Sequence, residues 1–476
     1  MTHDRRAERV RARAGRVMTR SHAATRAYFS GSALRALVAL TWAAPSLTLI
    51  LPRAEAWAQS LPQYPRQPVA PLQLPTDLPA LEPVWPARWS PRAGDAQPYM
   101  VLRESLLRPV KVIESRTWFG GADAHRAEDR ADFELLAREL PAGAPVPRFE
   151  AEGSNAYVVR LNDPPAADEP GAQPPQARRD RPRLAFKVIS AQPRADDAKT
   201  LVLERTSFVY LDATGQAKDA PRAIVLIMPG MFGTPEPIID QLQARLRSSG
   251  YAVLRMLAHP GRFTERFEHT IDPANLDASA KVLADTFGTR TAEAAYAVER
   301  AFAFVAEKVP GAGALPRVAV GMSGGGMILP TVVAREVEKY AGAIIIGGGC
   351  NFWGIAESSN YGRWIAATSV RWPSPPTEEQ RRALHEKYLR VASMDSYHTA
   401  ARLRGRRVLL LQGASDQAVP AVYGDLLWER LGRPERRLSN AGHELLFMML
   451  PTQWGEVLSW IDASVSAGEK RPQSER

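Results

Sequence analysis

From residue 183 onward the chain alternates short apolar runs with segments of helical spacing, and this pattern limits the possible folds more strongly than any other feature. Nearly unbroken runs of β-branched residues and leucine occur at 223–228, 251–257, 318–320, 341–346 and 407–412. Strands that are apolar on both sides are typical of a parallel sheet whose two faces are covered by helices. We therefore predict an α/β fold with a mainly parallel sheet, in which ligands bind at the carboxyl ends of the strands.

The other segments of this region fit the same architecture. Alternating apolar residues predict strands at 184–190 and 201–211, ahead of the first buried run. Helical spacing predicts helices at 235–249, 275–309 (one or two helices), 327–338, 419–431 and 444–465. A short strand is predicted at 435–438. The segment 351–404 interrupts the alternation and is predicted to be a helical cap insertion. The predicted domain covers 184–465, and 466–476 form a polar tail.

The first 58 residues have the pattern of an export signal. An arginine-rich start is followed by an apolar stretch, 36–51, and by a small-residue pattern ending at Ala58, where a signal peptidase can cut. The long charged start makes Met18 an alternative to Met1 as the first residue. Pro45 and the limited length of the apolar stretch argue against a membrane span. We expect an exported, periplasmic or secreted protein with no stable span after processing, and an uncleaved anchor is the alternative.

Two regions between the signal and the predicted domain contain no motif. Prolines are dense at 59–98, which predicts an extended linker. Residues 99–183 contain short apolar segments, one predicted helix at 131–140 and a second proline-rich stretch. We predict that they form a small N-terminal extension, whose structure the sequence does not specify.

Charge and cysteine content argue against several classes of function. Residues 1–58 hold ten arginines and three acidic residues, so most of the net charge of +10 lies in the predicted signal. The rest of the chain has no basic stripe with interleaved aromatics, and nucleic acid is therefore not an expected partner. The single cysteine, Cys350, cannot form an internal disulfide, and no histidine lies at metal-site spacing from it. We expect neither a metal nor a cofactor.

A serine flanked by glycines follows the apolar run 318–320. In Gly321-Met322-Ser323-Gly324-Gly325, the glycines leave room for a sharp turn from strand to helix that exposes the serine hydroxyl above the sheet. A glycine-rich turn with a bystander serine has the same five-residue pattern. The prediction of a nucleophile therefore depends on finding its partners.

A serine nucleophile needs a base, and the base needs an orienting acid. Asp416 follows the apolar run 407–412, and His443 lies between a predicted short strand and the last helix. The order serine, aspartate, histidine, with each residue at a strand end, favours a triad of Ser323, Asp416 and His443. Glu357, after the run 341–346, is an alternative acid.

A second glycine-rich turn, Pro229-Gly230-Met231-Phe232-Gly233, follows the first buried run. In this position a backbone amide helps to hold an oxyanion, and we predict the amides of Met231 and Gly324 as the two donors. The alternative is a tight turn whose glycines only permit the bend.

These motifs together resemble the α/β-hydrolase superfamily over roughly residues 185–465. The resemblance implies Ser323 as nucleophile, Asp416 as acid and His443 as base, with oxyanion donors at Met231 and Gly324. The stretch 408–431 looks like the C-terminal part of exported esterases and peptidase-like members. The oxyanion turn departs from the pattern, because it begins with Pro229 where many members have His-Gly.

Four apolar side chains are predicted to contact the substrate: Phe232, Met322, Phe352 and Trp353. The last two begin the insertion together with Tyr361 and Trp364, and these aromatic side chains can form an apolar cap over the serine. Packing within the core of the insertion is the alternative.

The sequence thus predicts an exported serine hydrolase that cleaves a carboxylic ester through an acyl-enzyme on Ser323. Its expected partner is a small-molecule or acyl substrate. A peptidase or amidase with the same triad is the first alternative, because the serine turn supports either reaction. A non-catalytic binding module of the same fold is the second, and the complete Ser-Asp-His order argues against it.

Overall fold

The computed structural model describes residues 70–72, 78–86, 100–104, 148–149, 183–193, 200–214, 221–231, 236–257, 267–363 and 368–469. All of these residues belong to one compact unit, Arg66–Arg476. The predicted signal and the predicted helix at 131–140 lie outside the described residues. None of the helices that are described is long and apolar enough to cross a membrane.

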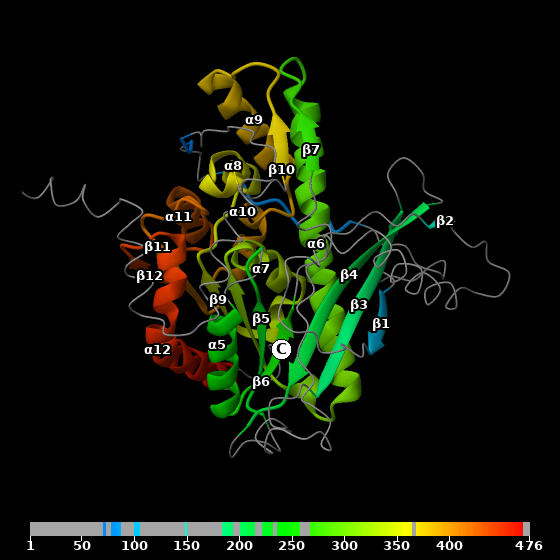
Figure 1. Cartoon of the computed structure of the whole chain (residues 1–476), viewed down its shortest axis with the longest axis vertical. Helices are drawn as coiled ribbons and strands as arrows, with labels where there is room; N and C mark the ends of the chain where they lie inside the picture. The colour runs from blue at the N-terminus through cyan, green and yellow to red at the C-terminus, as the bar shows by residue number, and fades with distance from the viewer. Residues whose placement is uncertain are drawn as a thin grey trace, which may run out of the picture. The chain divides into compact units, whose positions relative to one another are not determined.

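A ten-stranded sheet forms the centre of the fold (Figure 1). Its parallel part consists, in spatial order, of β6 (Ala252–Met256), β5 (Ile224–Met228), β8 (Arg317–Met322), β9 (Tyr340–Ile346), β11 (Val408–Gly413) and β12 (Glu435–Ser439). Beyond β6 lie the antiparallel strands β4 (Thr200–Leu211), β3 (Leu184–Pro193) and β1 (Met100–Glu104), and the short β2 (Arg148–Phe149) pairs with β4. The predicted α/β fold with a mainly parallel sheet is confirmed.

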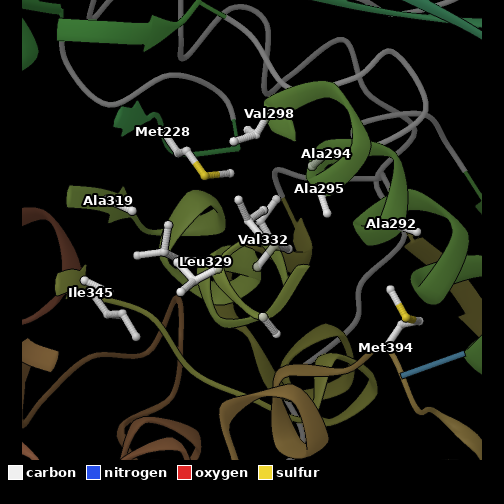
Figure 2. Packing of buried hydrophobic residues seen from close by; sticks show 14 of the residues in the cluster. Met228, Ala292, Ala294, Ala295, Val298, Ala319, Leu329, Val332, Ile345 and Met394 are labelled. Atoms are coloured by element: carbon white, nitrogen blue, oxygen red, sulfur yellow. The ribbon is translucent and has the colours of Figure 1, made fainter. Parts of the chain in front are cut away.

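Helices cover both faces of the sheet because the central strands are apolar on both sides. Every residue of β5 and β8 is buried. Alternate residues of β8 reach opposite faces, with Ala319 in one hydrophobic cluster and Val318 and Val320 in the other. The first cluster (Figure 2) includes residues of α6 (Leu276–Lys308), α7 (Gly324–Arg335) and α11 (Ala421–Arg430), and the second includes residues of α5 (Glu236–Ser248) and α12 (His443–Glu469). Two clusters on one sheet explain the unbroken apolar runs of the sequence.

The predicted helices form close to their expected bounds, with two differences. The segment predicted as one or two helices at 275–309 is the single helix α6, which has 33 residues. The last helix, α12, continues to Glu469 and so includes the first residues of the predicted polar tail.

The insertion at 351–404 is not purely helical. It contains α8 (Phe352–Ser358), α9 (Glu378–Val391) and α10 (Ser396–Thr399), but also the strand β10 (Thr368–Arg371). This strand pairs in parallel with β7 (Phe267–Thr270), which precedes α6 in the chain. We call β7, α8, the 3₁₀ helix Asn360–Arg363, β10 and α9 the cap region; its labelled helices and strands lie together at the top of Figure 1. The cap therefore uses two separate parts of the chain.

The predicted N-terminal extension is partly built into the central sheet. Strand β1 lies within the predicted region 99–183 and pairs antiparallel with β3, Met100 opposite Ser190. Strand β1 therefore adds one strand to the edge of the sheet from a segment that precedes the predicted domain boundary at residue 184. The sequence signal was weak because a single short strand gains its stability only from the neighbour with which it pairs.

Part of the predicted linker 59–98 lies against the domain. We call residues 70–72 and 78–86 the strap. Leu72 is buried, and Leu78 and Trp85 pack against the first hydrophobic cluster. The ring of Trp85 lies 5.7 Å from that of Tyr296 in α6, and the guanidinium of Arg335 lies 4.8 Å from the centre of each ring. The strap is thus anchored by packing and by cation–π contacts.

Side chains from distant parts of the chain bind the backbone of the strap. Five hydrogen bonds do so: Arg381 Nη2 to Ala70 O (3.1 Å), Arg430 Nη1 to Leu78 O (2.7 Å), Leu81 N to His398 Nδ1 (3.0 Å), Val84 N to Ser393 Oγ (3.2 Å) and Tyr296 Oη to Pro86 O (2.8 Å). An extended proline-rich chain makes no hydrogen bonds of its own, so these side chains satisfy its backbone groups. These residues of the predicted extended linker thus contact the domain, which the sequence analysis did not anticipate.

Candidate active site

Ser323 lies in a strained turn between β8 and α7. Its backbone has φ 50° and ψ −117°, a conformation that residues other than glycine rarely adopt. The turn is fixed on both sides, because Ser323 N donates to Ile346 O at 2.8 Å and Met327 N donates to Ser323 O at 2.8 Å. The predicted sharp turn from strand to helix is therefore present.

The two outer glycines of the motif are required by close backbone contacts. A Cβ atom at Gly321 would lie 2.6 Å from the carbonyl oxygen of Gly325, and one at Gly325 would lie 2.5 Å from that of Pro229. Both separations are shorter than any side chain tolerates next to backbone. The glycines thus allow β8, the serine turn and the turn after β5 to approach one another.

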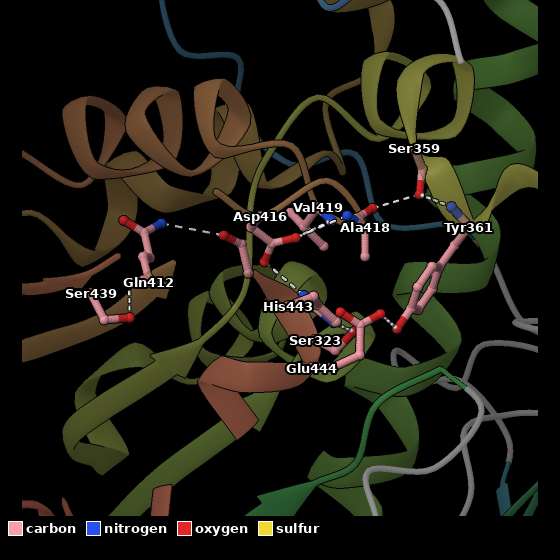
Figure 3. A network of polar contacts seen from close by, with 11 residues as sticks. Ser323, Ser359, Tyr361, Gln412, Asp416, Ala418, Val419, Ser439, His443 and Glu444 are labelled. Carbon is pink, nitrogen blue, oxygen red and sulfur yellow. Dashed lines mark hydrogen bonds and ion pairs between the residues drawn. The ribbon is translucent and has the colours of Figure 1, made fainter. Parts of the chain in front are cut away.

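The structure brings Ser323, His443 and Asp416 into one hydrogen-bonded line (Figure 3). Ser323 Oγ lies 2.9 Å from His443 Nε2, and His443 Nδ1 lies 2.7 Å from Asp416 Oδ2. His443 and Asp416 are 5% and 6% exposed, whereas Ser323 is half-buried. The hydroxyl is thus the member of the line that a ligand reaches, while the other two are shielded from solvent.

The second oxygen of Asp416 fixes the orientation of its carboxylate. Asp416 Oδ1 accepts hydrogen bonds from the amides of Ala418 and Val419, each at 2.9 Å. With this carboxylate as acceptor, Nδ1 of His443 must donate, which leaves Nε2 of the neutral ring free to accept from the serine hydroxyl. This arrangement leaves His443 Nε2 placed to accept the hydroxyl proton of Ser323.

Glu357, the alternative acid, lies elsewhere. Its carboxylate pairs with Arg381 Nη2 at 2.7 Å and with His385 Nε2 at 2.9 Å. Burial by itself would raise the pKa of Glu357, but the hydrogen bonds and charges of His385 and Arg381 outweigh burial and lower the pKa to about 2. Asp416, not Glu357, is therefore the carboxylate that contacts His443.

The two predicted oxyanion donors are adjacent. A Cβ atom at Gly324 would lie 3.0 Å from both the amide nitrogen and the Cβ of Met231, so the two backbones touch. Within the described part of the chain, no group accepts a hydrogen bond from the amide of Met231 or of Gly324. The Gly325 amide donates to Pro229 O at 3.0 Å and fastens the two turns together. With respect to the described residues, these two amides beside Ser323 therefore have no acceptor.

Two of the residues predicted to contact substrate, Phe352 and Trp353, are buried. Phe352 and Trp353 are 4% and 1% exposed; Phe352 packs against Phe287 of α6, and Trp353 packs against His385 of α9. Their packing within the core of the cap, the alternative raised from the sequence, is what the structure contains. Phe232 lies outside the described residues.

Met322 does not reach the site either. It is fully buried in the second hydrophobic cluster, with Val318 and Val320, because every second residue of β8 points to the same face. This placement argues against the predicted contact with substrate.

Two aromatic side chains flank the imidazole of His443. The rings of Tyr361 and Phe447 lie edge-on to it, with centroid distances of 5.7 and 5.0 Å. Phe447 follows His443 by four residues on α12, so helical spacing predicts that the two share a face. The position of Tyr361 depends on how the cap region packs, which the sequence pattern does not specify.

Among the residues that the structure describes, neither the cysteine nor a cluster of metal-binding side chains indicates a second centre. Burial and the nearby Asp395 raise the pKa of the Cys350 thiol, which is typical of an unreactive cysteine. In the part of the chain that is described, no group of three or more histidine, cysteine or acidic side chains is placed to hold a metal ion.

Comparisons with known proteins find similarity at the level of structure only. No protein-family model and no curated protein matches the sequence. An esterase of Pyrococcus furiosus is 11% identical, with a TM-score of 0.36, over 58% of this chain and 91% of that one. A cold-adapted esterase from an Arctic intertidal metagenomic library is 14% identical, with a TM-score of 0.36, over 60% and 96%. The acylaminoacyl peptidase of Pyrococcus horikoshii is 13% identical, with a TM-score of 0.32, over 50% and 36%. Similarity this low does not bear on function.

The topology of the chain identifies its fold. Parallel strands alternate with helices, a strained serine turn joins β8 to α7, an aspartate follows β11 and a histidine follows β12. This element order, with the strand–serine–helix turn and the order Ser-Asp-His, defines the α/β-hydrolase fold. The chain is an α/β-hydrolase-fold protein.

Proposed function

We propose that this protein is a serine hydrolase that cleaves carboxylic esters, with Ser323 as nucleophile, His443 as general base and Asp416 as its orienting acid. The observation on which the proposal rests is the line of two hydrogen bonds, 2.9 and 2.7 Å long, that joins the strained Ser323 to His443 and Asp416. A serine hydroxyl becomes nucleophilic when a positioned base removes its proton.

The reaction proceeds in two halves. His443 Nε2 takes the proton of Ser323 Oγ while that oxygen bonds to the ester carbonyl carbon. The resulting tetrahedral intermediate collapses when the leaving oxygen takes the proton from His443, releasing the alcohol and leaving an acyl group on Ser323. Water then gives a proton to His443 and attacks the acyl carbon, and the proton returns to Ser323 as the acid leaves.

Two features stabilise the charges that develop. The buried carboxylate of Asp416 lies 2.7 Å from the ring nitrogen that becomes part of an imidazolium. The amides of Met231 and Gly324 donate to the oxyanion, and each such donor typically contributes about 3 kcal/mol to transition-state stabilisation. Both features are in place before the reaction, so little reorganisation is needed.

The surroundings of the site favour an ester with an uncharged acyl group. Three apolar or aromatic side chains lie at the site: Met231 is half-buried beside the serine turn, and Tyr361 and Phe447 flank His443. Such a lining suits an acyl substrate better than a charged peptide side chain. An amide or peptide remains the second candidate, because the same triad and donors serve its hydrolysis.

We also propose that the protein acts outside the cytoplasm, after a signal peptidase cuts near Ala58. Residues 59–69 then join the new N-terminus to the strap at Ala70. Fractionation of producing cells, followed by N-terminal sequencing, tests this proposal: a mature chain beginning at Gln59 supports it, and a chain beginning at Met1 or Met18 contradicts it.

A fluorophosphonate probe tests the nucleophile. The wild type is expected to react once, at Ser323, and Ser323→Ala is expected not to react. Ser248→Ala is the matched control, because Ser248 is exposed at the end of α5 and its hydroxyl bonds to Arg245 O at 2.9 Å, within the same helix. An unreactive wild type, or undiminished labelling of Ser323→Ala, would overturn the proposal. Comparing p-nitrophenyl esters with p-nitroanilides of the same acyl group then ranks esters against amides.

A further inference from the structure

A short segment next to α8, Ser359–Tyr361, makes hydrogen bonds both to the loop that contains Asp416 and to α12, the helix that begins with His443 (Figure 3). Ser359 Oγ donates to Ala418 O at 2.6 Å, and Asn360 N donates to Gln417 O at 2.9 Å. The hydroxyl of Tyr361 donates to Glu444 Oε1 at 2.6 Å. One end of the segment is therefore fixed beside Asp416 and the other beside His443.

The imidazole of His443 is enclosed by this segment and two other elements. Tyr361 approaches at an interplanar angle of 79° from the cap, and Phe447 at 68° from α12. Gly347, which directly follows β9, lies on another side of the ring. A Cβ atom there would lie 3.3 Å from His443 Cε1, so the backbone of Gly347 is close to the imidazole. Edge-to-face ring pairs have a preferred geometry, and together these contacts limit the ring to one orientation.

We propose that Tyr361 is a positioning residue for His443, through which the cap region orders the base of the triad. This inference rests on the proposed function. The ring of Tyr361 restricts the imidazole, and its hydroxyl holds the carboxylate of Glu444 beside the base. The negative charge of that carboxylate favours the imidazolium that forms when Ser323 is acylated.

The charges around His443 support this role. Among the described residues, Asp416 is the charged group bonded to the ring, and Tyr361 is the titratable group packed against it; Glu444, which follows His443 in the chain, is exposed and bonds to Tyr361. Burial and the neighbouring Glu444 raise the pKa of Tyr361, so the phenol keeps its proton and continues to donate as the pH rises. Asp416 contacts the ring directly, while Glu444 acts only if Tyr361 holds it in place.

Three variants separate the ring from the hydroxyl. Tyr361→Phe keeps the ring and removes the hydrogen bond, Glu444→Gln removes the charge, and Tyr361→Ala removes both ring and hydrogen bond. The measurement is the second-order rate constant for fluorophosphonate labelling of Ser323 between pH 5 and 9, with kcat and KM for p-nitrophenyl butyrate. Tyr251→Phe is the matched control, because the hydroxyl of Tyr251 also bonds a carboxylate of α12, that of Asp462, away from the serine turn.

We expect Tyr361→Ala to lower the labelling rate by about tenfold or more, and Tyr361→Phe and Glu444→Gln to lower it by about two- to fivefold. Those two variants should also shift the midpoint of the pH profile downward together, and their combination should add nothing further. The change should appear in kcat with KM nearly constant, because ordering of the base affects chemistry and not ground-state binding. Tyr251→Phe should label like the wild type.

The inference and the proposed function fail in different ways. If the wild type labels at Ser323 but Tyr361→Phe and Glu444→Gln match it in rate and pH profile, Tyr361 does not position His443 and the proposed function stands. If the wild type does not label, the proposed function itself fails. If Tyr361→Ala does not fold, the other two variants still decide the question, because they leave the packing of the ring region intact.

Discussion

In the described part of the chain, a histidine and a carboxylate form a buried pair at two places, and one of these pairs has a serine hydroxyl beside it. In the first pair, Asp416 Oδ2 lies 2.7 Å from His443 Nδ1; in the second, Glu357 Oε2 lies 2.9 Å from His385 Nε2. The other nitrogen of His443 faces Ser323 Oγ at 2.9 Å, whereas that of His385 faces the Asn351 amide nitrogen at 3.4 Å.

The difference shows what turns such a pair into a candidate base. Glu357 is also paired with Arg381, which neutralises it, and His385 is completely buried within the cap. The second carboxylate oxygen of Asp416 accepts from the amides of Ala418 and Val419, and His443 faces a half-buried hydroxyl at the carboxyl ends of the strands. Pairing with a carboxylate is thus shared, but a reactive partner and access belong to the first pair alone.

Removing the serine hydroxyl or the imidazole of the first pair should have the largest effect on ester hydrolysis. We expect Ser323→Ala and His443→Ala each to reduce ester hydrolysis by about 10⁴- to 10⁶-fold, because nucleophile and base act as a unit. The rate of p-nitrophenol release from p-nitrophenyl butyrate measures this reduction. If the double variant loses much more activity than either single variant, the two residues do not act as a unit.

The two carboxylates should then behave differently when each is replaced by its amide. Asp416→Asn is expected to lower kcat by about 10⁴-fold, because the amide favours the wrong tautomer of the imidazole. Glu357→Gln should leave kcat within about threefold, since it acts on a histidine that faces no substrate. The same assay measures both, and comparable losses in the two variants would show that the pairs are not distinct.

Stability should show the opposite order. Glu357→Gln leaves the buried Arg381 without its negatively charged partner, a change that typically costs about 3–5 kcal/mol of unfolding free energy. Urea unfolding followed by circular dichroism measures the change at pH 7. Glu82→Gln is the control, because Glu82 forms a more exposed ion pair with Arg402, its side chain being 83% exposed. An equal, small change in both variants would contradict a structural role for the second pair.

Acid should weaken the wild type partly through Glu357. Its pKa is about 2 in the folded chain against an ordinary 4.5, so the unfolded chain takes up the proton first. The contribution of Glu357 to stability is complete above about pH 4.5 and is lost as the pH falls towards 2. Glu357→Gln should therefore lose less stability than the wild type between pH 5 and 3 in the same urea experiment. Parallel pH curves for the two proteins would exclude this explanation.

The strap provides the smallest test, because Arg381 of the second pair also binds Ala70 O. Trp85→Ala removes the contacts with Tyr296 and Arg335 at the other end of the strap, and we expect it to cost about 1–2 kcal/mol of stability. Labelling of Ser323 should be unchanged. Val84→Ala is the control, since the side chain of Val84 is 71% exposed. Equal melting temperatures for the two variants would show that the strap adds little.

The line of Ser323, Asp416 and His443 was accessible from the sequence because each residue follows a strand of a parallel sheet. The carboxyl ends of such strands meet at one edge, so residues far apart in sequence come together there. The glycines of the serine turn were equally informative, since backbone contacts at Gly321 and Gly325 exclude any larger residue.

Other features depend on packing that composition does not encode. Phe352 and Trp353 begin the insertion and are apolar, but only the position of α6 and α9 decides that they face the core and not the serine. The prolines of the strap predict an extended chain, but they do not indicate its hydrogen bonds to side chains such as Arg430, 352 residues away. Long-range contacts of single side chains have no periodic signal in a sequence.

The most direct test of the central claim is to trap the acyl-enzyme. Acid quenching during turnover of p-nitrophenyl butyrate, followed by mass spectrometry of the digested protein, should show one butyryl group on the peptide containing Ser323, and none in Ser323→Ala. Ester turnover without a covalent adduct, or an adduct that persists in Ser323→Ala, would contradict the account.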